Sequence, residues 1–157
     1  MVKKYSHKNV LDALYDRLDF LFKEFENIYV SFSGGKDSSL LLNMVLKFQK
    51  EYYPDKKIGV FHQDFEAQYT VTTEFIERTF KRIENDVYPY WVCLPMATRT
   101  ALSSYEMYWY PWDDTKEKSW IRPMPQHPYV INLQNNPITT YRYRMNQEAL
   151  AKQFGRW

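Results

Sequence analysis

The chain is poor in cysteine, and it contains no long hydrophobic run. Its single cysteine, Cys93, excludes an internal disulfide and a metal or iron–sulfur site built only from cysteines of one chain. No stretch approaches the roughly 20 apolar residues that a membrane helix needs. Residues 1–7 also lack the hydrophobic region of a signal peptide. We therefore expect a cytoplasmic protein that makes no contact with a membrane.

Neither sign of charge is in large excess. Lys and Arg total 21 and Asp and Glu total 19, which gives a net charge of +2. A strongly basic nucleic-acid binder is disfavoured, although a local basic patch stays open. The 157 residues, of which 45% are hydrophobic and 25% charged, fit one folded domain spanning residues 1–157.

Hydrophobic periodicity predicts helices that alternate with strands. We expect helices over residues 8–25, 40–53, 70–84, 98–107 and 139–154. We expect strands over residues 28–33, 58–62, 90–94 and 129–133. This alternation indicates an α/β fold with a parallel, doubly wound sheet, a nucleotide core over 28–104 and a Pro- and aromatic-rich loop over 105–128. Ligands bind such sheets beyond the carboxyl ends of the strands, at the switch point.

The clearest motif follows the first expected strand and precedes a helix. It reads Ser33-Gly34-Gly35-Lys36-Asp37-Ser38-Ser39. The glycines can take positive φ and lack a Cβ, so the backbone can wrap around a phosphate. The loop N–H groups, the helix N-terminus and the serine hydroxyls would donate to it, while Asp37 would cap the helix or reach a metal on the phosphates. The alternative is an ordinary Gly-Gly turn, but the whole heptapeptide favours phosphate binding.

Two carboxylates follow the second expected strand at the same edge of the sheet. Asp64 and Glu66 alternate, so both would point to one side and could bind Mg²⁺ or the nucleoside. The alternative is a pair of solvated loop carboxylates. His62 lies at a strand end and Cys93 lies within an apolar strand, between Val92 and Leu94, and we expect both to be packing residues.

Arginines and aromatic residues are concentrated in the second half. Arg122, in Trp120-Ile121-Arg122-Pro123, and the run over 141–144 are candidates for a distal anion, because Arg pairs with phosphate or sulfate through two hydrogen bonds. Ordinary surface arginines are an equally open interpretation. The aromatic cluster over 105–112 would either stack on bases or form a lid or interface, and we favour the second.

Residues 33–38 resemble the signature of the PP-loop ATP pyrophosphatases. Residues 62–69, 91–95 and 120–125 resemble the phosphoadenosine phosphosulfate (PAPS) reductase-like branch, and within it the phage- and island-borne IbrA-type proteins. The resemblance implies that the loop holds an adenine nucleotide, and that ATP with Mg²⁺ is cleaved between the α and β phosphates to adenylate a substrate.

On this resemblance we assign three sets of residues. The catalytic set is Lys36, Asp37 and Asp64. The metal-binding set is Asp37 and Asp64. The nucleotide-binding set is Ser33, Gly34, Gly35, Lys36, Asp37, Ser38, Ser39, Asp64, Glu66 and Arg122.

The resemblance leaves two other functions open. One is a protein that binds PAPS, but the reductases need a nucleophilic cysteine in a C-terminal tail, and no cysteine follows Cys93. The other is a nucleotide-sensing regulatory subunit. Because the segment over 105–128 is strongly apolar, we expect a second copy of the chain or a ParB-like protein to cover it and complete the site.

Overall fold

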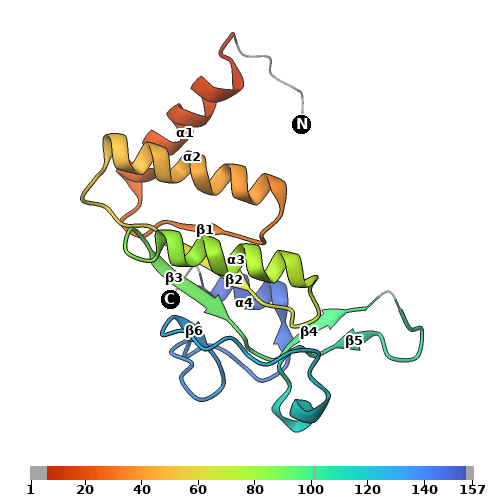
Figure 1. Ribbon diagram of the computed structural model, residues 1–157. Coiled ribbons are helices and arrows are strands. Elements are labelled where there is room, and N and C mark those ends of the chain that lie inside the picture. Colours follow the sequence, from red (N-terminus) through yellow and green to blue (C-terminus); the bar gives the residue numbers. More distant parts are fainter. Residues whose placement is uncertain (1–6, 101, 155–157) are drawn as a thin grey trace.

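The computed structural model describes residues 7–100 and 102–154 (Figure 1). At its centre lies a sheet of parallel strands in the order β1-β2-β3-β6, formed by Tyr29–Ser31, Gly59–Gln63, Tyr88–Val92 and Val130–Ile131. The predicted α/β fold with a parallel sheet is therefore confirmed. Among the described residues, no helix combines the length and apolar character that crossing a membrane requires.

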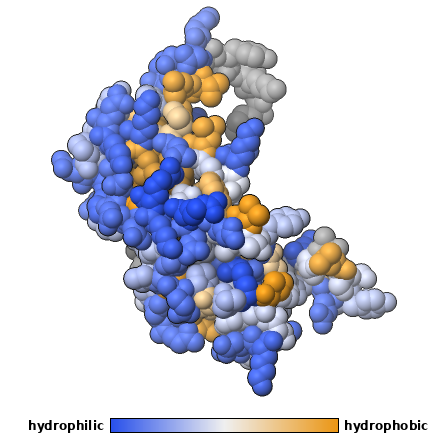
Figure 2. Space-filling view, viewed as in Figure 1, coloured by the Kyte–Doolittle hydropathy of each residue, from blue (hydrophilic) through white to orange (hydrophobic). Residues whose placement is uncertain are grey.

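Helices cover both faces of this sheet. Helices α1 (Val10–Glu24), α2 (Lys36–Tyr52) and α3 (Thr70–Ile83) share one hydrophobic core with Val60 and Trp91. Helix α4 (Gln147–Phe154) shares the other core with Phe61 and Val92. Neighbouring strand residues point to opposite faces, so each strand contributes to both cores. Helix α1 leaves apolar side chains in solvent, including Val10 and Phe20. Figure 2 shows hydrophobic surface at the end of the molecule where α1 lies in Figure 1.

The strand order runs in one direction, since α2 and α3 cross over the same face. Strand β1 is therefore an edge strand, and the described sheet has no switch point, which corrects the expectation for the ligand site. The carboxyl ends of β1, β2 and β3 still share one edge. The amide of Phe32 donates to the carbonyl of Phe61 at 2.8 Å, and that of Asp64 donates to Val92 at 2.9 Å. The segments that follow these strands consequently lie side by side.

The C-terminal half differs from the expected elements. A helix was expected near 98–107, but β4 (Met96–Arg99) and β5 (Tyr108–Trp109) form an antiparallel hairpin there, and β7 (Met145–Asn146) pairs with β4. Threonines and aromatic residues favour strands, and Ala101 lies outside the described residues. The last helix begins at Gln147 rather than 139, because residues 139–146 form turns and β7.

The aromatic-rich segment divides between solvent and core. Tyr105 is 96% exposed at the tip of the hairpin, whereas Trp112 is 1% exposed and belongs to the core beside α3. A short 3-10 helix, η1 (Asp114–Ser119), follows. The protein itself therefore buries Trp112, while the exposed apolar side chains of this segment are those of the hairpin and Ile121, which is 64% exposed.

Candidate functional site

The loop over residues 33–39 joins β1 to α2 at the carboxyl edge of the sheet. Gly34 has a φ of 79°, in the left-handed region that favours glycine. A Cβ at Gly34 would lie 2.7 Å from Cγ1 of Ile76 and 3.2 Å from Cγ2 of Thr72, both on α3. Gly35 is extended instead, with a φ of −77°. Glycine is thus required at 34 by both conformation and space, so that the loop can pass close to α3.

The N-terminus of α2 has no side-chain cap. Gly35 is the N-cap residue, and Asp37 lies inside the first turn, so the expectation that Asp37 caps the helix is wrong. Lys36 and Asp37 are both exposed beside this end of the helix. A helix N-terminus whose N–H groups have no acceptor carries partial positive charge and is a ready site for an anion.

The three serines form hydrogen bonds within the loop. Ser38 and Ser39 donate their hydroxyls to the carbonyl of Gly35 at 3.1 and 2.7 Å. The hydroxyl of Ser33 lies 3.0 Å from that of Ser38. These bonds hold the loop in its turn before any ligand arrives. Whether the hydroxyls also contact a phosphate stays a prediction.

Asp64 is fully buried directly after β2, and both of its carboxylate oxygens have protein partners. Nη2 of Arg122 donates to the two oxygens at 2.5 and 2.7 Å. The indole Nε1 of Trp91 donates at 2.7 Å, and so does the amide of Glu66. A solvated carboxylate, the alternative left open by the sequence, is therefore excluded. The contacts favour a structural role in which Asp64 positions Arg122.

Glu66 is also buried, and it joins distant parts of the chain. It has a positive φ of 61° and is 1% exposed. Its carboxylate accepts the amides of Trp112 and Ile121, each at 2.9 Å, and its carbonyl accepts Nε of Arg122 at 3.0 Å. The guanidinium of Arg122 lies 4.9 Å from the ring centre of Trp112. The structure therefore places Asp64, Glu66 and Arg122 in one cluster, with Arg122 bonded to the carboxylate of Asp64 instead of standing free for a distal anion. The sequence alone does not indicate that Trp91 and Trp112 contact this cluster.

His62 and Cys93 are buried beside this network, as packing residues were expected to be. Nδ1 of His62 lies 2.8 Å from the carbonyl of Phe32, and burial lowers the pKa of the ring, so the imidazole is neutral at pH 7. Burial, followed by the charge of Asp64, raises the pKa of the Cys93 thiol well above its ordinary value. The sulfur is therefore a protonated, inaccessible thiol rather than a thiolate nucleophile.

A second buried carboxylate anchors the run over 141–144. Burial raises the pKa of Asp113, but hydrogen bonds from Thr115, Arg144 and Tyr143 outweigh it and lower the pKa to about 2. Arg144 is thereby engaged with Asp113 and is not free for a distal anion. Local sequence gave no signal for this pair.

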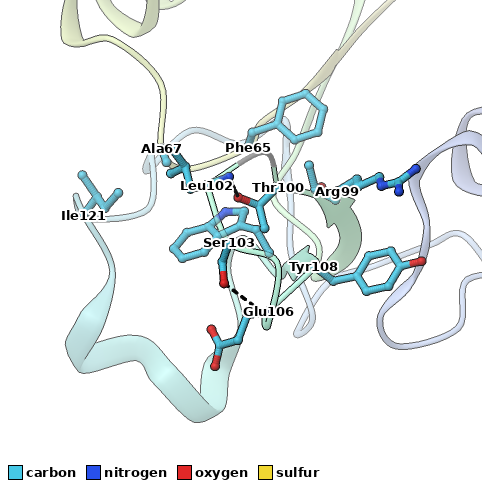
Figure 3. Close-up of a pocket in the computed structure, with 11 residues that line it drawn as sticks. Phe65, Ala67, Arg99, Thr100, Leu102, Ser103, Glu106, Tyr108 and Ile121 are labelled. Carbon is cyan, nitrogen blue, oxygen red and sulfur yellow. Dashed lines mark hydrogen bonds between the residues drawn. The ribbon is translucent and has the colours of Figure 1, made fainter.

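Two hollows lie at this edge of the sheet, and no residue of the loop over 33–39 lines either of them. The first, the loop pocket, includes Thr72, the residue that a Cβ at Gly34 would approach; it is lined by Ala67, Gln68, Tyr69, Thr72 and Ile121. The second, the hairpin pocket, has a volume of about 430 Å³ and is lined by Phe65, Ala67, Thr98, Arg99, Thr100, Leu102, Ser103, Glu106, Tyr108, Trp109 and Ile121 (Figure 3). The two hollows share Ala67 and Ile121 as lining residues.

The described residues contain no cluster of three or more His, Cys, Asp or Glu side chains that could hold a metal ion. Magnesium in nucleotide sites is commonly held by one or two carboxylates, with phosphate oxygens and waters completing its shell. The exposed carboxylate of Asp37 fits that arrangement. Asp64 does not fit it, because its oxygens are engaged by Arg122 and Trp91.

Comparison with known proteins gives one family and one relative. Residues 27–143 match the phosphoadenosine phosphosulfate reductase domain. Uncharacterized protein YbdN of Escherichia coli (strain K12) is 31% identical over 151 residues, which cover 95% of this chain and 35% of the relative. The chain therefore spans about a third of the length of that relative. No solved structure is significantly similar to the chain.

Proposed function

The chain belongs to the phosphoadenosine phosphosulfate reductase domain family, a PP-loop type of nucleotide-binding protein, and we propose that its ligand is ATP with Mg²⁺. In this proposal the loop over 33–39 holds the phosphates, and ATP is cleaved between the α and β phosphates to adenylate a second substrate. We also propose that, within this family, the chain belongs to the IbrA-type branch.

The observation that carries the proposal is the uncapped N-terminus of α2. Gly35 offers no side chain to accept the first-turn N–H groups, and Lys36 adds a full positive charge beside them. Gly34 keeps the backbone open at a position where any other residue would meet Ile76. These features together make a positively polarised cradle of backbone, which suits a polyphosphate.

The residues of the loop would act mainly by position and charge. In the reaction a nucleophilic oxygen of the acceptor forms a bond to the α phosphorus, and the bond from that phosphorus to the bridging oxygen breaks, so that pyrophosphate leaves with the electron pair. Lys36 and the α2 N-terminus would stabilise the negative charge on the phosphates. Mg²⁺ would neutralise the leaving pyrophosphate, with Asp37 as its protein ligand. Asp64 and Glu66 would position the surrounding segments through Arg122, Trp112 and Ile121.

Calorimetric titration with Mg–ATP tests this assignment. Lys36→Ala should weaken binding about tenfold, because charge-assisted contacts to phosphate are lost. Lys47→Ala is the matched control, since Lys47 is an exposed lysine on the same helix. Equal affinity in the two variants would contradict the site. Release of AMP and pyrophosphate with the wild type would establish the cleavage position.

The family name favours PAPS as the second candidate ligand. Binding of PAPS would use the same cradle. Its reduction would need a thiol from elsewhere, because Cys93 is fully buried and protonated. Titration with PAPS in place of ATP separates the two ligands, and the tighter one identifies the substrate.

We also propose that a second copy of the chain or a ParB-like protein covers the tip of the β4–β5 hairpin. Leu102 and Tyr105 are 97% and 96% exposed there. Light scattering over a concentration series should show association that Tyr105→Ser weakens. A monomer at all concentrations, with no partner on co-purification, would contradict this.

A further inference from the structure

The hairpin pocket lies beyond the loop pocket, at the carboxyl edge of the sheet. We propose that it binds a second ligand beside the nucleotide, and that this ligand carries a flat ring and a positively charged amine. The inference rests on the proposed nucleotide site, because the two pockets meet at Ala67 and Ile121. It names the chemical class of the second substrate that the proposed function requires.

The size and walls of the pocket suit a small organic molecule. Its volume of about 430 Å³ lies within the range of small-molecule sites, which are typically apolar with a few polar groups. Phe65, Tyr108 and Trp109 contribute aromatic rings, and Leu102 and Ile121 contribute aliphatic side chains. Aromatic walls favour a flat ring, which can stack on them or meet their edges.

Two charged residues line the pocket, and they are placed differently. Figure 3 shows the side chain of Arg99 extending away from Ala67, Leu102 and Ser103. Glu106 is held by its backbone, whose amide donates to Oγ of Ser103 at 3.0 Å (Figure 3). Its carboxylate forms no hydrogen bond or ion pair with the described residues. Arg99 has no such partner either, but its side chain extends away from Ala67, Leu102 and Ser103, so we assign the charge that a ligand meets at that part of the pocket to Glu106.

The surroundings of Glu106 strengthen that preference for a cation. Glu106 also lines a neighbouring hollow together with Tyr110, Trp120 and one cation, Lys116, which does not line the hairpin pocket. Tyr108 and Trp109 line both cavities. The faces of aromatic rings attract cations, and a carboxylate accepts charge-assisted hydrogen bonds from an ammonium group. A ligand that carries a carboxylate or a sulfate at this place would instead be repelled by Glu106.

A pair of probes with the same ring and opposite charge tests the inference. Phenethylamine and phenylacetate are titrated into the full chain at neutral pH, and binding is followed by saturation-transfer NMR on the probe. We expect phenethylamine to bind at least tenfold more tightly than phenylacetate. Glu106→Gln should weaken the binding of phenethylamine about tenfold. Glu24→Gln removes an exposed carboxylate at the end of α1 and should leave that binding unchanged.

Either of two results would overturn the inference: equal binding of the two probes, or equal binding of the amine to wild type and Glu106→Gln. Circular dichroism shows that each variant is folded before it is compared. Mg–ATP is titrated into the same samples. Amine binding without ATP binding would refute the proposed function and keep the pocket, whereas ATP binding without amine binding would refute the pocket alone.

Discussion

Removal of the cation from the buried Asp64–Arg122 pair should destabilise the protein strongly. Arg122→Met leaves Asp64 fully buried and deletes its contacts to Nη2 at 2.5 and 2.7 Å. Breaking a buried pair from one side costs about 3–5 kcal/mol, because an uncompensated charge stays inside. Since a domain of this size is stable by only about 5–15 kcal/mol, the loss should be large in any unfolding experiment.

Removal of the anion should cost less, because the two partners are buried unequally. The side chain of Asp64 is 0% exposed and that of Arg122 is 18% exposed, so only the guanidinium can turn to water. Asp64→Asn should cost about 1–3 kcal/mol, the typical effect of unsatisfied hydrogen-bonding groups. The double variant should be more stable than Arg122→Met alone, because no buried charge remains.

The free energies of unfolding of Arg122→Met, Asp64→Asn and the double variant are measured by urea titration at pH 7, with circular dichroism as the signal. Arg78→Met is the control, since Arg78 forms an exposed ion pair with Glu74. The unfolding free energy of this variant should equal that of the wild type. The reasoning is refuted if Arg122→Met loses no more stability than Arg78→Met, or if Asp64→Asn loses more than Arg122→Met. Loss of ATP binding in a stable Asp64→Asn protein would return Asp64 to the ligand-binding residues.

Three further changes have defined outcomes. Gly34→Ala should cost about 1–3 kcal/mol in urea unfolding, because its Cβ would lie 2.7 Å from Ile76. Gly35→Ala meets only a serine hydroxyl at 3.4 Å and should cost less, about 0.5 kcal/mol, since Ala is a poorer N-cap residue than Gly; equal losses would contradict the loop geometry. Burial raises the pKa of Asp113, but hydrogen bonds outweigh it and lower the pKa from an ordinary 3.8 to about 2. The ionised carboxylate therefore contributes fully to the free energy of unfolding above pH 3.8, and this contribution is lost as the pH falls toward 2. The stabilities of wild type and Asp113→Asn should converge over that interval, and a constant difference would refute the shift. Cys93 should not react with Ellman's reagent in the folded protein, and Cys93→Ala should keep any nucleotide turnover within a few-fold of the wild type. A loss of turnover of about a thousandfold in a folded variant would identify Cys93 as a nucleophile.

Local pattern was sufficient for the first half of the fold. The apolar spacing in α1, α2 and α3 and the β-branched and aromatic runs in β1, β2 and β3 carry their own signals, and glycines at 34 and 35 mark the turn between β1 and α2. Each of these elements was expected within a few residues of its observed position. They place the loop over 33–39 at the carboxyl edge of the sheet.

The rest depends on contacts between residues that are distant in sequence. Glu66 accepts amides from Trp112 and Ile121, which are 46 and 55 positions away, and nothing near Glu66 indicates them. The same holds for Asp64, whose inward orientation is fixed by Arg122, 58 positions away. The β4–β5 hairpin was mistaken for a helix, because its short strands have too few residues to show a period of two.

Backbone amide NMR during titration with Mg–ATP tests the central claim most directly. If the loop over 33–39 holds the phosphates, the largest chemical-shift changes should fall on the amides of Gly34, Gly35, Lys36, Asp37 and Ser38, since these N–H groups would donate to the ligand, whereas the amide of Ser39 already donates to the carbonyl of Gly35 at 3.0 Å. Largest changes at other amides, or no change at millimolar ATP, would contradict a nucleotide site at this loop.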